Sequence, residues 1–509
     1  SDELGELTST HAEILAEQLA GTGANTCAFS GWTAYSTVDT ALCGAQNIGD
    51  GTVTVINEDI TWSGDVNLNG KVVVLSPATL TIEPGTVVKA AFKADPVDAS
   101  AIVIARGGTI IANGTAALPI VLTTEYDPLT AGDVAAGTYV ADNFDLTIGG
   151  LWGGLIVLGD NVIGEDGGVE SIEGIVEGET WTEYGGSETN DSSGSMKYIS
   201  IRHGGATIGN GDEINGLTLG GVGNGTVIEN IEIVSNTDDG IEFFGGNVNV
   251  NNLLIYNQTD DAIDIDEAYS GTVTNSLVVL GAGSDNVFEI DGSEDSTGAV
   301  TGSYTINNVT AVGATGQTQM DQYGHWKSGA TGANNNVVFK DFATGTYVEG
   351  IESSTFNAGT LTFSNLDFVT SDDLATVNSI SSRSASDELG ELTSTHAEIL
   401  AEQANGSGST ETQYYDWTAY FYGGYGNTLS SGDLQEVDEF KIYPNPVNDV
   451  LNVSSNVPVK SLKLFNITGQ LVKTNENLNS LDMSEVSRGI YLLEISSDTT
   501  VQTKRIVKK

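Results

Sequence analysis

A repeat of 22 residues in the middle of the chain constrains its fold more than any other feature of the sequence. The segment VIENIEIVSNTDDGIEFFGG at 227–246 is followed at 250–269 by VNNLLIYNQTDDAIDIDEAY, in which Asn252 holds the place of Asn230. Each copy contains two or three short apolar runs, which is typical of a β-solenoid with one coil per repeat. The sequence therefore predicts an all-β fold whose main domain, residues 53–378, is a right-handed parallel β-helix.

Related segments extend the repeat in both directions. Further copies start at 273 and 305, and earlier coils are predicted from the segments 71–90, 101–124, 150–160 and 198–205. Alternation along the strands predicts two inward-facing ladders, formed by Ile199, Ile231 and Leu253 and by Ile201, Ile233 and Ile255. Asparagines recur at the start of the strand, and their amides are expected to hydrogen-bond from coil to coil: Asn230, Asn252, Asn275 and Asn308.

Composition and charge agree with this fold and exclude some partners. Gly contributes 63 of 509 residues and Pro only 8, as expected for a β-rich chain with many turns. The net charge of −51 would repel nucleic acid and anionic membranes, so neither is predicted as a partner. It favours divalent cations instead, although a soluble, non-sticky exterior explains it equally well. No run of eighteen apolar residues exists, so no membrane span is predicted.

The last seventy residues differ from the rest of the chain. Residues 441–509 carry a net charge of +3 and the preceding residues −54. Their alternating apolar residues predict a small Ig-like β-sandwich over 440–509. The block contains several short motifs in order, carried by Tyr443, Pro444, Asn445, Pro446, Gly469, Gly489 and Tyr491. In these motifs it resembles the type A C-terminal sorting domain of the Bacteroidetes type IX secretion system.

This resemblance implies a location for the protein. It predicts that the chain is secreted or displayed on the surface of a diderm bacterium, with the type IX secretion machinery as its partner. Because such cargo first reaches the periplasm, we expect that a signal peptide was removed before Ser1. In an exported protein, Cys27 and Cys43 are predicted to form a disulfide, the alternative being two free thiols.

The chain also contains an identical duplication. Residues 1–18 recur as 386–403, and with the same offset Trp32-Thr33-Ala34-Tyr35 recurs as Trp417-Thr418-Ala419-Tyr420. Each copy predicts a short helix with capping-box spacing. The first copy belongs to a predicted cap at 1–52, and the second lies in a predicted linker at 379–439. The duplication is either a recent event without a role or a docking element, through which the protein caps itself or self-associates.

Acidic residues recur at equivalent places in three successive coils. We expect them to lie along one strip of surface, because adjacent coils are about 4.8 Å apart. Such an oxygen-rich cluster suits Ca²⁺, and the alternative is a solvated acidic face. No organic cofactor is predicted. The candidate metal ligands are Asp238, Asp239, Asp260, Asp261, Asp264, Asp266, Asp285 and Asp291.

The same residues suggest an enzymatic alternative. Asn236-Thr237-Asp238 and Asp260-Asp261 resemble the NTD and DD motifs of β-helical polygalacturonases. The His-Gly pair and the later Arg-x-Lys of those enzymes are missing at the corresponding places. A pectate-lyase-like site would need Ca²⁺ and a basic residue, for which Arg202 is the candidate because alternation predicts that it points outward. Five aromatic residues suit either sugar stacking or, more commonly, core packing: Trp152, Trp181, Tyr184, Tyr323 and Trp326.

The sequence thus favours an exported β-helix protein with a structural or adhesive role, stabilised by cations and self-assembling through its duplicated elements. In this interpretation none of its residues is catalytic. The alternative is a polysaccharide-degrading β-helix enzyme, pectate-lyase-like or polygalacturonase-like, whose catalytic residues would come from Asp238, Asp260, Asp261 and Arg202.

Overall fold

The chain forms two compact units, Ser1–Asn427 and Thr428–Lys509. The computed structural model describes residues 45–141, 144–175, 179–206, 214–314, 323–342, 348, 350–369 and 406–423 of the first unit, and 440–443, 447, 449–455, 458–466, 471–475, 480–487, 489–496 and 501–508 of the second. The identical copies at 1–18 and 386–403 and the predicted disulfide of Cys27 and Cys43 lie outside these residues.

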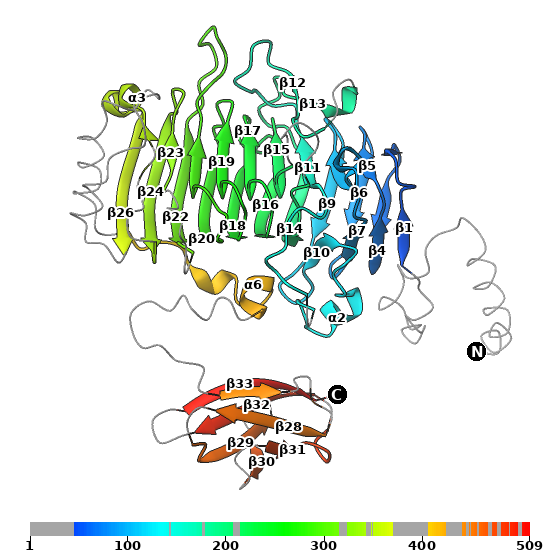
Figure 1. Ribbon diagram of the computed structural model, residues 1–509. Coiled ribbons are helices and arrows are strands. Elements are labelled where there is room, and N and C mark those ends of the chain that lie inside the picture. The colour runs from blue at the N-terminus through cyan, green and yellow to red at the C-terminus, as the bar shows by residue number, and fades with distance from the viewer. Residues whose placement is uncertain are drawn as a thin grey trace, which may run out of the picture. The chain divides into compact units, whose positions relative to one another are not determined.

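The first unit is a parallel β-helix whose strands lie side by side along the solenoid (Figure 1). Among the described residues, ten strands form one parallel sheet: β2 (Thr54–Ile56), β5 (Lys71–Val74), β8 (Ala101–Ile104), β11 (Gly154–Leu158), β15 (Leu217–Gly220), β17 (Ile241–Phe244), β19 (Ile263–Asp266), β21 (Phe288–Ile290), β23 (His325–Trp326) and β25 (Gly350–Ile351).

A second parallel sheet contains fourteen described strands. Its continuous path is β1 (Gln46–Ile48), β4 (Asp65–Leu68), β7 (Val87–Ala90), β10 (Ile120–Thr124), β14 (Gly194–Arg202), β16 (Val227–Val234), β18 (Asn249–Tyr256), β20 (Thr272–Val279), β22 (Tyr304–Val312), β24 (Gly332–Lys340) and β26 (Leu361–Val369). A side branch is formed by β3 (Ile60–Trp62), β6 (Thr79–Ile82) and β9 (Thr109–Asn113). The segment 150–160 contributes to the ten-stranded sheet, whereas 198–205 contributes to this one.

The two predicted inward ladders are confirmed. Ile199 lies opposite Ile231, which lies opposite Leu253, and the ladder of Ile201, Ile233 and Ile255 has the same register. All six side chains are at most 1% exposed and belong to the continuous core of the solenoid. Because each coil alone would leave its apolar face uncovered, stacking of the coils supplies the hydrophobic stabilisation.

The asparagine ladder is also present, and backbone geometry explains it. Asn230, Asn252, Asn275 and Asn308 adopt φ angles of 58° to 60°, at a bend inside each long strand. Asparagine tolerates this left-handed conformation better than other non-glycine residues. The Nδ2 atom of Asn252 donates to Oδ1 of Asn230 at 3.1 Å, and Asn275 donates to Asn252 at 2.7 Å.

Short elements decorate the solenoid. They are the helices α2 (Ala131–Ala135), α3 (Ser353–Ala358) and α6 (Ala419–Tyr422), the 3₁₀ turns Pro96–Asp98, Thr180–Thr182 and Glu411–Gln413, and the hairpin of β12 (Glu170–Ser171) and β13 (Glu183–Tyr184). Residues 406–423, hereafter the docked segment, run from the last coils back to β16 across the outside of the fourteen-stranded sheet (Figure 1). None of the described helices is long and apolar enough to cross a membrane.

The second unit contains two antiparallel sheets around a small apolar core, as predicted for a β-sandwich. One sheet consists of β27 (Phe440–Tyr443), β28 (Val450–Ser455) and β31 (Ser480–Asp482). The other consists of β29 (Ser461–Asn466), β30 (Leu471–Asn475), β32 (Gly489–Ser496) and β33 (Val501–Lys508). Tyr443 ends β27 and Gly489 begins β32, whereas 444–446 and Gly469 lie outside the described residues. Tyr491 is buried and donates its hydroxyl to the Ser487 carbonyl at 2.8 Å.

Candidate functional site

Four polar side chains form a row across the outer face of the ten-stranded sheet. Glu242 on β17 lies opposite Asp264 on β19, which lies opposite Glu289 on β21, which lies opposite His325 on β23. The inward neighbours in these strands are buried apolar residues, so alternation directs the row away from the core. Parallel register therefore places successive side chains about 4.8 Å apart.

A second line of acidic residues lies in the turns that lead into these strands. Oδ1 of Asp239 accepts a hydrogen bond from the backbone N–H of Asp261 at 2.8 Å, and Oδ1 of Asp261 accepts from the N–H of Asn286 at 2.5 Å. Each carboxyl group thus satisfies a backbone donor of the next coil. The predicted acidic residues of successive coils do come together, for a reason that is partly structural.

Their exposure differs from the sequence-based expectation of a surface strip. Asp239, Glu242, Asp261 and Asp264 are only 1–8% exposed, whereas Asp260 and Asp285 are exposed to solvent. Burial raises the pKa of all four buried carboxyl groups, and the charges of neighbouring carboxylates raise it further. A solvated acidic face is therefore the wrong description of the centre of this cluster.

The cluster contains three groups of carboxylates whose oxygen atoms lie within 4.8 Å of one another: Asp238, Asp239 and Asp260; Asp239, Asp261 and Asp264; and Glu242, Asp264 and Asp266. Oδ1 of Asp264 and Oδ1 of Asp266 are buried and accept no hydrogen bond from the described part of the chain. Oxygen-only sites of this kind suit a hard cation such as Ca²⁺. Asp285 and Asp291 belong to none of the three groups found among the described residues.

A lysine borders the cluster at the end of β23. Nζ of Lys327 lies 2.6 Å from Oε1 of Glu289 and 3.1 Å from Oδ2 of Asp291, and Nδ1 of His325 lies 3.7 Å from Oε1 of Glu289. Partial burial opposes the charge of Lys327, but its hydrogen bonds to these two carboxylates raise its pKa above the ordinary value. Lys327 is therefore held as a cation.

Glu289 and Asp261 form a pair of carboxyl groups with opposite proton affinities. They share a hydrogen bond, and burial together with Glu289 raises the pKa of Asp261. Burial also acts to raise the pKa of Glu289, but the hydrogen bonds from Asp261 and Lys327 lower it overall. Asp261 thus binds a proton more tightly than an ordinary aspartate, and Glu289 loses its proton more readily than an ordinary glutamate.

The sequence alone did not single out His325 and Lys327 as members of this site. The segments 293–303 and 313–324 separate β21 from β23 and hide the repeat. One pattern could have revealed them: His325-Trp326-Lys327 has the same alternation as Glu289-Ile290-Asp291, with the apolar residue facing inward in both.

Arg202 occupies a different place from the one expected. Its side chain points away from the solenoid interior, as alternation predicted, but it is only 1% exposed and lies on β14 of the other sheet. Burial lowers its pKa, while the charges of Glu232 and Asp127 act in the opposite direction. The structure therefore does not bring Arg202 beside Asp238, Asp260 and Asp261 as a member of one site.

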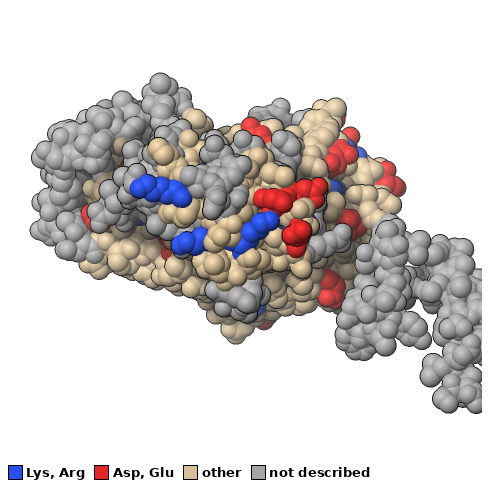
Figure 2. All heavy atoms as spheres, turned by 90° about the horizontal axis from the view of Figure 1, so that it is seen from below, with Lys and Arg blue, Asp and Glu red and all other residues tan. Residues whose placement is uncertain are grey.

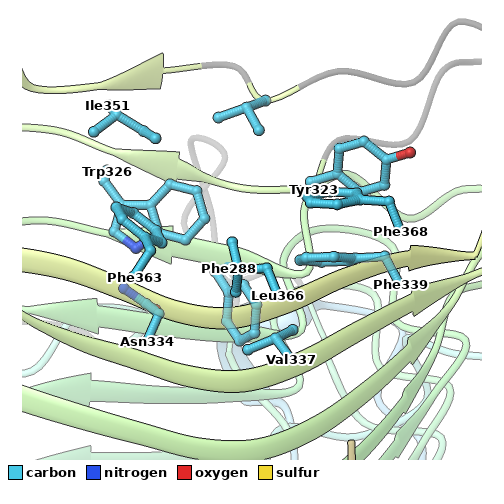
Figure 3. Close-up of a pocket in the computed structure, with 11 residues that line it drawn as sticks. Phe288, Tyr323, Trp326, Asn334, Val337, Phe339, Ile351, Phe363, Leu366 and Phe368 are labelled. Carbon is cyan, nitrogen blue, oxygen red and sulfur yellow. The ribbon is translucent and has the colours of Figure 1, made fainter. Parts of the chain in front are cut away.

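The five candidate aromatic residues pack inside the protein. Trp152, Trp181, Tyr184, Tyr323 and Trp326 are at most 9% exposed. Figure 3 shows Tyr323 and Trp326 facing the interior of the last coils, around an apolar cavity of about 20 Å³. A second cavity beside Asp291 measures about 50 Å³. Neither cavity is large enough for a sugar ring, since ligand pockets are typically hundreds of Å³.

Charge is unevenly distributed over the chain: residues 1–440 carry a net charge of −54, and residues 441–509 carry +3. On the face shown in Figure 2, Lys and Arg side chains gather in one area and most Asp and Glu side chains in another.

Comparisons with known proteins agree with the two-unit organisation. Residues 441–509 match the family described as secretion system C-terminal sorting domain. β-Agarase D of Zobellia galactanivorans is 31% identical over 78 residues, which is 15% of this chain and 16% of that protein. The tailspike protein gp49 of Acinetobacter baumannii bacteriophage Fri1, a capsular polysaccharide depolymerase, is 8% identical with a TM-score of 0.28, over 91% of this chain and 78% of that chain. A TM-score this low supports no further comparison.

The sorting domain shows that the protein is exported by the type IX secretion system to the cell surface or the extracellular space, as its motifs predicted. The remaining match is to the description pectate-lyase-like beta helix domain and covers residues 54–422, which include every strand of the solenoid from β2 to β26 and the docked segment up to Tyr422. The chain therefore belongs to the pectate-lyase-like β-helix family.

Proposed function

We propose that the protein is an exported enzyme that cleaves polysaccharides by hydrolysis at the acidic cluster. The observation that carries this proposal is the presence, in one cluster, of carboxyl groups with opposite pKa shifts: hydrogen bonds lower the pKa of Glu289, and burial raises the pKa of Asp266 well above its ordinary value. Glycoside hydrolysis needs one carboxylic acid to protonate the leaving oxygen and one carboxylate to act on water or on the sugar. Neighbouring groups with opposite pKa shifts supply these two roles.

In this mechanism Glu289 is the base that takes a proton from water, and Asp266, which is partly exposed and whose pKa is raised by burial, is the acid that protonates the leaving oxygen. Asp261 is hydrogen-bonded to Glu289, closer than the about 5 Å or more that separates acid and base in glycoside hydrolases, and it positions Glu289. The Glu289 side chain is 24% exposed and Lys327 is 36% exposed, so this edge of the cluster can meet a substrate. Lys327 keeps Glu289 ionised and stabilises negative charge near it.

The geometry favours hydrolysis over a lyase reaction. A lyase removes a proton beside a carboxylate and needs a basic residue that is neutral when it acts. Lys327 is held as a cation by Glu289 and Asp291, and Arg202 lies on the other sheet, away from this cluster. Neither residue is therefore suited to act as the base in such a reaction.

The proposed substrate is a neutral or weakly charged polysaccharide bound along the outside of the solenoid. The net charge of −51 repels polyuronates, and the two cavities are too small to enclose a sugar. The family and the β-agarase relative are consistent with a polysaccharide substrate.

The test is to incubate the purified full chain with a panel of neutral and uronate polysaccharides and to measure new reducing ends. Glu289→Gln is expected to lower the rate by about 10²–10⁴-fold. Glu229→Gln is the matched control, because Glu229 pairs with Lys197 on β14 and lies outside the cluster. Products that absorb ultraviolet light would be unsaturated uronates, which a lyase forms, and would show that the proposed mechanism is wrong. Equal activity in both variants would also contradict it.

A second candidate function rests on a different observation, the buried Oδ1 atoms of Asp264 and Asp266 without a donor among the described residues. We propose that a Ca²⁺ ion binds to Glu242, Asp264 and Asp266 and stabilises the solenoid, which would suit a structural or adhesive protein on the cell surface. Melting and light scattering with Ca²⁺ and with EDTA test it. A higher melting temperature and assembly in Ca²⁺ support the structural role, whereas indifference to both additives rejects it.

A further inference from the structure

The first half of the docked segment binds the outside of the solenoid mainly through its backbone. The N–H groups of residues 407, 409 and 410 donate to Asn336 Oδ1 at 2.5 Å, to Thr310 Oγ1 at 2.9 Å and to Asn275 Oδ1 at 2.5 Å. These acceptors belong to β24, β22 and β20 in turn. The segment therefore crosses one strand after another, along the line of the asparagine ladder.

Its second half is held by side chains and by the start of α6. The Trp417 ring packs against Tyr198 at 5.4 Å, and the Tyr420 ring packs against Tyr256 at 5.0 Å. The N–H groups of Ala419 and Tyr420 donate to the buried Glu232 carboxylate at 2.9 and 2.8 Å. The docking surface thus consists of Asn336, Thr310, Asn275, Tyr256, Glu232 and Tyr198.

Residues 21–35 carry most of the same docking residues with an offset of 385, except that Phe29 stands in the place of Tyr414, whose hydroxyl donates to the Leu253 carbonyl at 3.2 Å. The buried positions of the docked segment are Gly408, Tyr414 and 417–420. In residues 21–35 these positions hold Gly23, Phe29 and the identical Trp-Thr-Ala-Tyr. The positions that are exposed in the docked segment differ instead: Thr412, Gln413, Tyr415 and Asp416 correspond to Cys27, Ala28, Ser30 and Gly31.

Two glycines strengthen this correspondence. A Cβ atom on Gly406 would lie 2.6 Å from the carbonyl oxygens of Asn365 and Val337, and Gly408 has a φ of +65° with Thr310 Oγ1 in the way of a Cβ. Both positions therefore require glycine, and Gly21 and Gly23 hold them in the first copy. Agreement at the two glycines and at 417–420, together with change at the exposed positions, indicates that both copies fit the same surface.

We propose that residues 21–35 bind to the docking surface of their own chain, in exchange with residues 406–420. Parallel register places Gln46 five strands away from Ile233, through Val66, Val88, Leu122 and Ile201. This separation is about 24 Å at about 4.8 Å per strand.

The chain from Tyr35 to Gln46 can span up to about 36 Å, since an extended residue covers about 3.3 Å. The copy therefore reaches the surface of its own molecule. Such a short connection gives it an effective concentration near the millimolar range, which another molecule would not match in dilute solution.

A double-mutant cycle in the full chain tests the exchange. Trp32→Ala is expected to leave the melting temperature of the solenoid unchanged, and Trp417→Ala to lower it only slightly, because residues 21–35 then cover the surface. The double variant is expected to melt several degrees lower than either single variant. Asp416→Gly is the matched control, since it introduces the residue of the first copy at an exposed position. Equal losses in Trp417→Ala and the double variant would overturn the proposal.

Photocrosslinking keeps the proposal testable if the double variant fails to fold. A benzophenone amino acid at position 31 of the Trp417→Ala chain, which keeps Trp32, should attach to the peptide that contains Tyr198, within one molecule. A product of twice the mass would show binding between molecules and overturn the assignment to the same chain. Crosslinks that avoid β14 altogether would show that the two copies do not share a surface.

Discussion

At the scale of single residues, Asn252 shows how a side chain serves both backbone and neighbour. It sits at a φ of 59° and bonds with Asn230 and Asn275 through its amide. Asn252→Ala should lower the free energy of unfolding by about 1–2 kcal/mol, because alanine disfavours the left-handed backbone conformation. Each lost hydrogen bond should lower it by about 1 kcal/mol more. Asn252→Gly should recover the backbone part only. Urea unfolding measures both, with exposed Asn251→Ala as the control, and equal losses for Ala and Gly would contradict the backbone explanation.

Glu267 makes the stability of the solenoid depend on pH. Burial raises its pKa to about 8, against the hydrogen bond from Tyr184, and the charges of Glu165 and Glu294 add to the rise. Between its ordinary pKa near 4.5 and about 8 the folded state binds more protons than the unfolded state. Stability must therefore fall as pH rises through this window, by at most about 1.4 kcal/mol per pH unit.

The variant Glu267→Gln isolates this effect. It should be close to the wild type in stability at pH 5, where Glu267 is protonated in the folded state, and more stable than the wild type at pH 8. Thermal melts at pH 5, 6.5 and 8 provide the measurement, and the exposed Glu58→Gln serves as the control. A variant that is equally destabilised at every pH would indicate a purely structural role for the carboxyl group.

At the scale of elements, the start of α6 depends on one buried carboxylate. Glu232 accepts from Ala419, Tyr420 and Ser200, and Arg202 donates from Nε to the same Ser200 hydroxyl at 2.7 Å. Glu232→Ala removes the anion at the helix N-terminus and leaves the buried Arg202 with the charge of Asp127 alone, which should cost about 3–5 kcal/mol of unfolding free energy. The double variant with Arg202→Met should be less destabilised than Glu232→Ala alone. If the losses of unfolding free energy in Glu232→Ala and Arg202→Met add up to the loss in the double variant, this coupling is contradicted.

Elements with local periodicity could be predicted from the sequence, and those covered by distant segments could not. The ladders of Ile231 and Ile233 follow from alternation and the 22-residue period. The burial of Arg202 does not, because the docked segment that reaches its neighbour Glu232 lies about two hundred residues later in the chain. The position of Lys327 could not be predicted for another reason. Long insertions interrupt the repeat before β23, so the register of this strand could not be read from the sequence.

At the scale of the whole molecule, the two units have separate cores and should unfold separately. All six tryptophans precede residue 428, so tryptophan fluorescence reports on the first unit alone. Leu464→Ala, in the core of the second unit, should cost that unit about 2–5 kcal/mol. Circular dichroism should show the loss while the fluorescence transition stays in place. Leu253→Ala should do the opposite, and a shift of both transitions by either variant would show coupled unfolding.

The docked segment also limits how this solenoid can change in length. Solenoids commonly gain or lose whole coils, because each coil contacts only its neighbours. Here the docked segment contacts six successive strands, from Asn336 on β24 to Tyr198 on β14, at fixed spacings. Deleting one coil between them would displace Trp417 from its partner by about 4.8 Å. The segment therefore fixes the number of coils between β14 and β24. Variation in coil number among relatives is expected before β14.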